Sequence, residues 1–284
     1  MRRSKFLIIG ITLSLLACVS SACTSIARDI DGDRRLLWAN ALSVSRPDYR
    51  VIYEEQKYSD APYDNSTDTV VVTVEPRWPA ISQSDVFGRQ DLTMHAEEGT
   101  VAIPNLRDWA LTDAVRSLSS KADHARTKKA TVQRLKELAR IDDLRVTVVV
   151  GFTNPLQEEK VREILSRVPD VALFSTYRDS GKLPLSWDYD GYCNSRGFDS
   201  CRPDIRTSLT SMFRKWVDLL TSEDSSDLRA FGLSLDELRA SAKSGLWYGA
   251  IIQVGPKEGL ALASIPEIDV LALGEMIVAF NDRP

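Results

Sequence analysis

A short stretch of the chain, SWDYDGYC, places two carboxylates among three large aromatic side chains. Asp188 and Asp190 alternate there with Trp187, Tyr189 and Tyr192. Ring faces and carboxylates together are typical of sites that bind a carbohydrate or a peptide, because such sites combine apolar area with a few placed polar groups. A structured loop whose aromatic side chains pack locally is the more common outcome, and the sequence leaves both interpretations open.

Two cysteines follow this stretch directly. Cys193 and Cys201 flank a loop of seven residues that contains Gly and Ser, CNSRGFDSC, and a disulfide between them suits an oxidising compartment. Closing so short a loop stabilises a fold by about 2–3 kcal/mol. A zinc site is the alternative to the disulfide. It is disfavoured because His95 and His124 lie far away in the sequence and no second cysteine pair is available as ligands. We expect a disulfide, with no metal and no cofactor.

Residue patterns typical of catalysis are missing from the sequence. A Gly-x-Ser-x-Gly turn does not occur, and both histidines stand in polar or loop contexts, so a catalytic triad has no support. No glycine-rich loop of the kind that holds phosphate groups is present. Carboxylate pairs, which glycosidases use, are too numerous to be informative. The sequence therefore predicts a protein that is not an enzyme.

The amino end has the pattern of an export signal. Arg2, Arg3 and Lys5 form a basic region, and an apolar run, FLIIGITLSLLA, follows over residues 6–17. At about 1.5 Å per residue, this run is too short for a stable span of a hydrocarbon core about 30 Å thick. Residues 1–22 are therefore predicted to be a lipoprotein signal peptide that is removed on export.

Two cysteines at the end of this signal are candidates for lipidation. LLAC, ending at Cys18, resembles a bacterial lipobox, in which the thiol is diacylated and the chain is cut just before it. Cys23 is the alternative: it lacks an aliphatic residue three positions earlier, but its use would leave no cysteine unpaired. Plain secretion after Ala22 is the third interpretation. The favoured one is a lipoprotein anchored through Cys18 on the extracytoplasmic face of the cell membrane.

Charge narrows the range of partners. The formal net charge is −4, and loss of the signal removes basic residues and no acidic one, so the exported part is more acidic still. Proteins that bind nucleic acid carry basic patches, and electrostatic docking on anionic lipid also needs basic residues. We therefore expect no nucleic acid partner, and membrane attachment through acyl chains alone.

The first part of the exported chain divides into a tether and a mixed segment. Residues 23–45 are predicted to be a polar tether. Residues 46–142 begin with two strands rich in β-branched and aromatic residues, YRVIYEEQ and DTVVVTVE. Apolar residues three and four apart then predict two helices, or one long helix, over Asn105–Asp142. His124 falls in the polar middle of that region and is expected on the surface.

Residues 143–284 are predicted to form an α+β domain. LRVTVVVGF predicts a strand, a helix capped by Asn154 follows, and VALFSTY predicts the next strand. GLWYGAIIQV, a short helix from Pro256, and IDVLALGEMIVAF repeat this β-α-β order. Each helix ends in a matching phrase, VPDVAL or IPEIDV, in which proline and an acid turn the chain back into the sheet.

Two β-α-β units in one sheet predict a ferredoxin-like duplicated sandwich with right-handed crossovers; a chance likeness between two ordinary crossovers is the alternative. A helical insert, residues 203–245, separates the units. It is predicted to begin with Asp204 as cap, to pack through Trp216, and to end with a helix between Ser234 and Gly245. The fold class is therefore α+β, with a β-rich and helical segment before the sandwich.

Several positions in the two units follow a recognisable pattern. The matching residues are Phe152, Pro155 and Leu156 at the entry to the first helix, and Tyr248, Gly249, Gly255 and Leu260 in the second unit. Over Arg145 to Phe280 this pattern resembles the C-terminal extracytoplasmic domain of bacterial sigma-factor regulators. The resemblance implies a sensing or interaction domain with no chemistry to carry over. Those regulators span the membrane, whereas only Met1 to Lys5 precede the apolar run here, so direct capture of a sigma factor is not expected.

Three hypotheses on function follow from the sequence. The favoured one is an anchored extracytoplasmic binding or sensory lipoprotein without catalytic activity, which acts with an envelope or membrane protein partner. A cell-envelope structural or assembly factor is the second, and it predicts a large exposed apolar patch. An envelope hydrolase is the third, and it predicts a deep pocket with a strongly shifted carboxylate.

Overall fold

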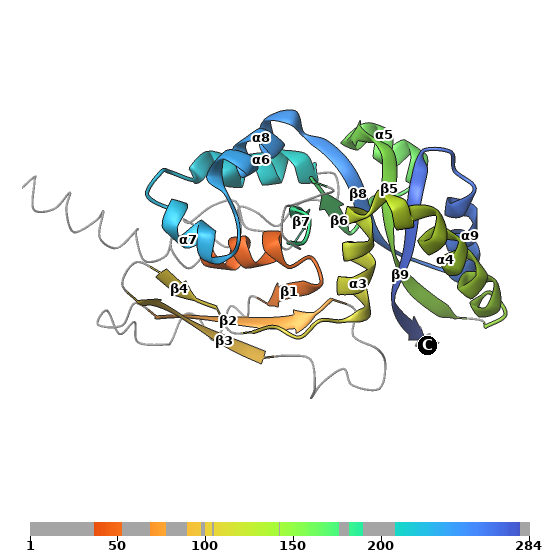
Figure 1. Ribbon diagram of the computed structural model, residues 1–284, viewed down its shortest axis with the longest axis horizontal. Helices are drawn as coiled ribbons and strands as arrows, with labels where there is room; N and C mark the ends of the chain where they lie inside the picture. The colour runs from red at the N-terminus through yellow and green to blue at the C-terminus, as the bar shows by residue number, and fades with distance from the viewer. Residues whose placement is uncertain are drawn as a thin grey trace, which may run out of the picture.

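The computed structural model describes residues 37–52, 69–77, 90–97, 100–103, 105–141, 143–175, 182–189 and 208–278. A helix over residues 37–45 comes first, and strands and helices follow (Figure 1). The strands are β1 (Tyr49–Ile52), β2 (Thr69–Pro76), β3 (Gln90–Glu97), β4 (Thr100–Ala102), β5 (Leu144–Gln157), β6 (Val171–Leu173), β7 (Ser186–Asp188), β8 (Leu246–Val254) and β9 (Ile268–Val278). The α-helices are α3 (Ala110–Arg116), α4 (His124–Leu138), α5 (Glu158–Leu165), α6 (Leu209–Leu219), α7 (Ser225–Ala230), α8 (Leu235–Ser244) and α9 (Pro256–Ala263), and two 3₁₀ turns, Ser117–Ser119 and Lys121–Asp123, join α3 to α4.

The strands form two antiparallel sheets. The first has four strands in the order β1-β2-β3-β4, and the second has five in the order β7-β6-β8-β5-β9. The predicted mixed α+β class is therefore confirmed. The four-stranded sheet comes from the segment that the sequence predicts to be β-rich, and the five-stranded sheet comes from the chain after it.

The two matching phrases, VPDVAL and IPEIDV, occupy related corners of the five-stranded sheet. The first leads from α5 into β6, which pairs with β8, and the second leads from α9 into β9, which pairs with β5. At the first corner the amide of Asp170 donates to the carbonyl of Ile251 at 3.1 Å. At the second, the amide of Thr153 donates to the carbonyl of Glu267 at 2.9 Å. The first corner is therefore hydrogen-bonded to β8, the partner of β6, and the second corner to β5, the partner of β9.

Helices cover both faces of the five-stranded sheet. Alternate residues of a strand face opposite sides, and Val149, Val171 and Ile251 lie with α3 in one apolar cluster. Val148, Val150 and Ile252 face the other way, into a larger core that includes α5 and residues of α9. This larger core continues through the insert to the four-stranded sheet and the first helix, so the two sheets share one apolar interior (Figure 1).

The first helix corrects the predicted tether. The sequence predicts a polar tether over residues 23–45, but residues 37–45 are helical and almost wholly buried. Trp38 and Leu42 are fully enclosed in the shared core, and the Trp38 indole N–H donates to Asp227 of α7 at 2.7 Å. The polar composition that predicts a tether belongs to the preceding residues, which lie outside the described part. Residues 37–45 carry the apolar periodicity of a core helix.

The predicted cap of the first crossover helix, Asn154, is wrong. Asn154 was expected to cap a helix, but β5 continues to Gln157 and α5 begins at Glu158. After an irregularity beyond Gly151, Leu156 pairs with Trp247 of β8. Pairing with the neighbouring strand therefore overrides the local preference for a capped turn.

The insert is helical, as predicted, but it begins later than the sequence suggests. Ser208, not Asp204, caps α6, and its side chain accepts from the amide of Ser211 at 3.1 Å. The predicted end is confirmed: Gly245 follows α8 with φ +61°, a left-handed conformation that glycine adopts most readily. Trp216 is buried, as expected. Asp204 itself lies outside the described residues.

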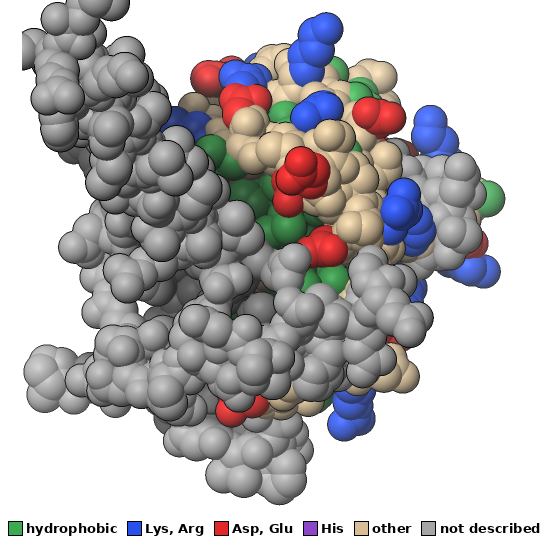
Figure 2. Space-filling view, turned by 90° about the vertical axis from the view of Figure 1, so that its left-hand side faces the viewer, with side chains coloured by type: hydrophobic (Ala, Val, Ile, Leu, Met, Phe, Trp, Pro, Cys, Tyr) green, Lys and Arg blue, Asp and Glu red, His purple; other side chains and the backbone are tan. Residues whose placement is uncertain are grey.

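Figure 2 shows the face that lies at the left of Figure 1. Acidic and basic side chains are interspersed over the described part of this face. Among the helices that the structure describes, none combines the length and the apolar character needed to cross a membrane.

Candidate functional site

Trp187 and Asp188, the centre of the predicted binding stretch, lie inside the protein. Trp187 is 1% exposed, and its ring centroid lies 5.4 Å from that of Trp216 and 5.7 Å from that of Phe213. Asp188 is 2% exposed and forms an ion pair with Arg77 of the four-stranded sheet. In this structure both side chains are used for packing and pairing, so neither presents a surface to a ligand.

The rest of that stretch is only partly described. Tyr189 is half-buried, and its hydroxyl lies 3.4 Å from a guanidinium nitrogen of Arg162. Burial raises the pKa of Tyr189 above its ordinary value, so the phenol stays neutral. Asp190 and Tyr192 lie outside the described residues, as do all four cysteines, Cys18, Cys23, Cys193 and Cys201. Ligand binding by this stretch, the disulfide and lipidation therefore stay predictions.

The sequence predicts that His124 lies on the surface, but the structure buries it. It is 8% exposed at the start of α4, with Nδ1 2.7 Å from a carboxylate oxygen of Asp269 and Nε2 3.3 Å from the carbonyl of Leu118. It therefore ties α4 to β9. No group of three His, Cys, Asp or Glu side chains in the described part of the chain is placed to hold a metal ion.

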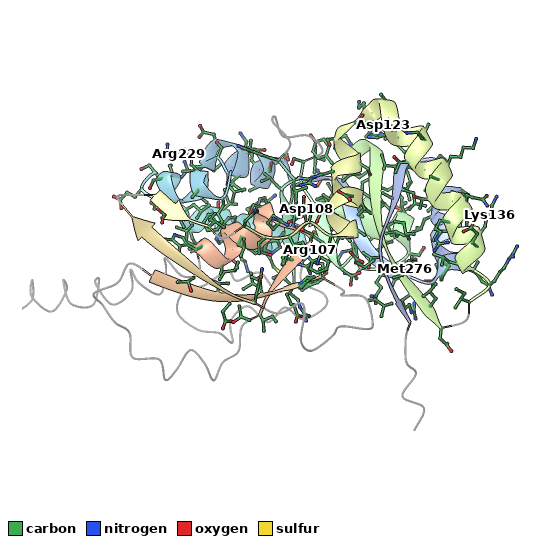
Figure 3. The ribbon with its side chains drawn as sticks, turned by 60° about the horizontal axis from the view of Figure 1, so that its bottom comes forward. Arg107, Asp108, Asp123, Lys136, Arg229 and Met276 are labelled. Atoms are coloured by element: carbon green, nitrogen blue, oxygen red, sulfur yellow. The ribbon has the colours of Figure 1, made fainter. Side chains whose placement is uncertain are left out.

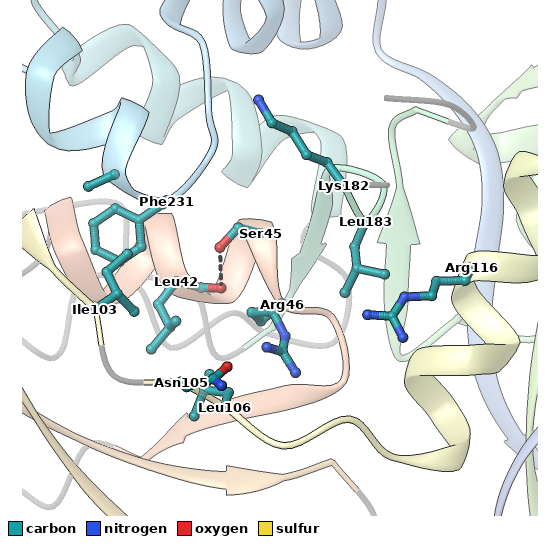
Figure 4. A pocket seen from close by; sticks show the side chains of 11 residues that line it. Leu42, Ser45, Arg46, Ile103, Asn105, Leu106, Arg116, Lys182, Leu183 and Phe231 are labelled. Carbon is teal, nitrogen blue, oxygen red and sulfur yellow. Dashed lines mark hydrogen bonds between the residues drawn. The ribbon is translucent and has the colours of Figure 1, made fainter. Parts of the chain in front are cut away.

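A pocket of about 470 Å³ opens where the first helix, α3, α7 and the 182–183 loop meet. Its size lies in the usual range for small-ligand sites, about 300–1,000 Å³. Figure 4 shows the side chains that surround it. Apolar side chains form much of the lining, and the charged ones are all basic; these are Leu42, Ile103, Leu106, Leu183, Ala230 and Phe231, with Arg46, Arg116 and Lys182.

Arg46 is held in place from behind. Its Nε and Nη2 donate to the two carboxylate oxygens of Asp48 at 2.9 and 2.7 Å, and Asp48 also accepts from the hydroxyl of Thr112 at 2.6 Å. Asp48 is almost fully buried, so it is part of the wall and not of the opening. Burial alone would lower the pKa of Arg46, but the hydrogen bonds and charge of Asp48 outweigh it and raise that pKa. The guanidinium is therefore a fixed positive charge.

Arg116, at the end of α3, faces Arg46 across the pocket (Figure 4). The carboxylate of Asp108 lies between them: one oxygen is 2.7 Å from Nη1 of Arg116, and the other is 3.6 Å from Nη2 of Arg46. The hydrogen bond to Asp108 is the main cause that raises the pKa of Arg116. Asp108 is 48% exposed and lies at the junction of α3 with the four-stranded sheet (Figure 3).

Two further hollows of the described surface suit a ligand less well. In the one between α6 and α8, Arg214 donates to the carbonyl of Ala242 and Arg239 to the carbonyl of Leu220, so these basic side chains cap helix ends. In the one between α3 and α4, Arg126 and Arg134 are paired with acids one turn away on or beside their own helix. The pocket that contains Arg46 and Arg116 is therefore the candidate site.

Sequence reasoning misses this pocket. Arg46, Arg116 and Lys182 lie in three separate regions of the chain, and none belongs to a motif of chemical residues. The only local signal is the acid that accompanies each arginine, Asp48 two residues after Arg46 and Asp113 three before Arg116, and such pairs are common on protein surfaces. What the pocket requires is the tertiary contact between α3 and the turn after the first helix, where Thr112 donates to Asp48, and no local pattern predicts it.

Comparison with known proteins adds no relative to this geometry. No protein-family model, no curated protein and no solved structure matches the chain.

Proposed function

We propose that this chain is a non-catalytic binding or sensory lipoprotein, exported and held by acyl chains at the extracytoplasmic face of the cell membrane, and that the pocket between Arg46 and Arg116 is its binding site. The observation that carries the proposal is the lining of this pocket, which joins an apolar floor to fixed positive charge. Among its described lining residues there is no histidine, cysteine or carboxylate to act as nucleophile or base. Such a site suits binding and not turnover.

The sequence supports the location in this proposal. A basic region and a short apolar run precede two cysteines in small-residue contexts, Cys18 and Cys23. Cys193 and Cys201 are spaced for a disulfide, which an exported protein can keep.

We further propose that the five-stranded sheet is a ferredoxin-like duplicated sandwich with β7 added at one edge. The strand order supports this, because β6 and β9, the second strands of the two β-α-β units, each pair with the first strand of the other unit. This arrangement is compatible with the resemblance to the extracytoplasmic domain of sigma-factor regulators. Any regulatory role would act through a partner protein in the membrane or envelope.

The exposed surface gives less support to an assembly factor. In the described part of the chain, the large apolar side chains with substantial exposure are Ile141, Leu219 and Met276. These are too few to form the large patch that an assembly factor would present to its partners.

Changing the lipidation cysteine tests the proposed location. With Cys18→Ser, the chain is expected to move from the membrane fraction to the soluble extracytoplasmic fraction, because the diacyl thioether is its only anchor. Fractionation with immunoblotting measures this, and mass spectrometry of the wild-type amino-terminal peptide identifies the acylated residue. Cys193→Ser is the matched control and should stay with the membrane.

Cys23→Ser separates the two candidate anchors. If this variant is released and Cys18→Ser is not, the anchor is Cys23 and the proposal holds with that residue. If both single variants and the wild type are found in the cytosol, or if the wild type is soluble outside the cell, the membrane-anchored lipoprotein is refuted.

A further inference from the structure

Asp108 lies beside the residues that line the pocket, and it takes the place between the two guanidinium groups that a bound carboxylate would take. It lies between two guanidinium groups, 2.7 Å from Arg116 and 3.6 Å from Arg46, yet its side chain is about half exposed. The longer distance is beyond a hydrogen bond, so Arg46 attracts Asp108 by charge alone. Exposed ion pairs of this kind contribute little to stability, and a ligand can replace one at small cost.

Arg116 keeps a free edge for such a ligand, and Arg46 keeps one free nitrogen. Asp48 uses Nε and Nη2 of Arg46, and the carbonyl of Arg107 also accepts from Nη2 at 3.1 Å, which leaves Nη1. Arg116 directs Nη1 to Asp108 and, at 3.5 Å, to Asp113, which leaves Nη2 and Nε. The planar edges of guanidinium groups match the two oxygens of a carboxylate in geometry.

Next to this charged end, apolar side chains line the pocket together with the polar Asn105. Leu42, Leu106, Ile103 and Phe231 line it from the first helix, the 103–106 segment and the end of α7. Ser45, the one hydroxyl in the lining, donates to the carbonyl of Leu42 at 3.1 Å (Figure 4). A ligand that fits both parts carries one negative group and an apolar chain or ring.

We propose that the pocket binds an amphiphilic monocarboxylate, whose carboxylate displaces Asp108 from Arg116 and whose apolar part lies on Leu106 and Phe231. This inference rests on the proposed binding function and names the class of its ligand. Asp108 then acts as an internal competitor that keeps the two guanidinium groups paired while the pocket is empty. Because the lining includes residues of the first helix, α3 and α7, the ligand would contact three separate parts of the fold at once.

Binding of octanoate tests the proposal. The full chain in lipid nanodiscs is titrated with octanoate by calorimetry, and empty nanodiscs provide the blank for partitioning into lipid. Octanoate is expected to bind saturably, whereas octylammonium, which has the same chain with the opposite charge, is not. Arg116→Met should weaken octanoate binding at least tenfold, because it removes the main partner of the carboxylate. Arg126→Met, which removes an exposed arginine paired with Asp123 outside the pocket, is the control and should change nothing.

The variant Asp108→Asn distinguishes a specific carboxylate site from a surface that attracts anions only through its overall positive charge. Removing the internal competitor while keeping its shape is expected to tighten octanoate binding about threefold to fivefold. Weaker binding by Asp108→Asn, equal binding by Arg116→Met, or no binding of octanoate at all would overturn the proposal. Binding of a short peptide through its free C-terminal carboxylate, without binding of octanoate, would replace the amphiphile by a peptide ligand.

A separate measurement distinguishes this inference from the proposed function. Native mass spectrometry of protein taken from its own membranes reports any retained small molecule. A molecule kept by the wild type and lost in Leu106→Arg supports a binding function even where octanoate fails, and then only the ligand class is wrong. If nothing is retained and no anionic probe binds, both the ligand class and the binding function of this pocket are refuted.

Discussion

Asp188→Ala is expected to lower the free energy of unfolding by about 3–5 kcal/mol, the usual cost of removing one partner from a buried ion pair. Asp188 and Arg77 are both almost fully buried. Without Asp188, the Arg77 guanidinium loses the carboxylate with which it forms a buried ion pair, whereas its bonds to the carbonyls of Pro47 and Tyr49, each 3.1 Å long, remain. A buried positive charge would then have lost its directly paired carboxylate, at the junction of β7 and the four-stranded sheet.

Urea denaturation followed by tryptophan fluorescence at neutral pH measures this loss, with an unchanged slope against urea as the sign that only stability has changed. Asp218→Ala, which removes an exposed aspartate of α6, is the matched control and should stay within about 0.5 kcal/mol of the wild type. Replacing both partners, Arg77→Leu with Asp188→Leu, should cost less than the sum of the two single changes, because no unpaired charge remains.

The outcome also decides how the SWDYDGYC stretch is understood. A folded Asp188→Ala protein of wild-type stability that no longer bound its partner would restore Asp188 as a binding residue. Loss of stability with octanoate binding retained by the folded fraction would assign Asp188 to the fold.

Strand and helix order in the last part of the chain is predictable from sequence because several local signals agree there. Pro256 begins α9, Gly245 ends α8, and β5 has a long run of β-branched residues. Where signals conflict, tertiary pairing decides. Asn154 and Pro155 have the chemistry of a helix start, but pairing of Leu156 with β8 extends the strand past both.

The site is less predictable than the fold, for a physical reason. Trp187 and Asp188 resemble ligand-binding residues in the sequence because binding sites often combine aromatic ring faces with carboxylates. In the structure both side chains are buried. Asp188 is buried because it forms an ion pair with Arg77, which lies more than a hundred positions away in the chain. Arg46 and Arg116 meet only when β1 packs against the 107–109 segment, through contacts such as the bond from the Trp109 indole to the Tyr49 hydroxyl at 2.7 Å.

Glu158 is the second position at which a large effect on stability is expected. It begins α5 but serves the first turn of α6: its carboxylate accepts from the amides of Leu209 and Thr210 at 3.1 and 2.9 Å, and from the hydroxyl of Ser208 at 2.6 Å. Arg162 donates to it from the next turn of α5 at 3.0 Å. A carboxylate at a helix amino end satisfies free amides and complements the helix dipole. Glu158→Ala removes the acceptor of the buried amides of Leu209 and Thr210 and should lower the free energy of unfolding by about 3 kcal/mol.

The same contacts predict a dependence on pH. Burial alone would raise the pKa of Glu158, but the hydrogen bonds from Ser208, Thr210 and Arg162 outweigh it and lower that pKa below its ordinary value. The stabilisation is therefore complete above the pKa of the unfolded chain. It is lost as the pH falls below about 5 and through the lowered pKa of the folded protein. Glu158→Gln, which cannot ionise, should lack this part of the acid sensitivity.

Comparison of wild type and Glu158→Gln at pH 7 and at pH 4 isolates the effect of this one carboxylate. The comparison is needed because Asp170, whose pKa is raised by burial, changes stability with pH in the opposite sense in both proteins. The stability difference between the two proteins should be largest at pH 7 and smaller at pH 4. Glu159→Gln, at the exposed neighbouring position, should follow the wild type at both values. A difference that is equal at pH 7 and pH 4 would show that the side chain's shape, and not its charge, holds the start of α6.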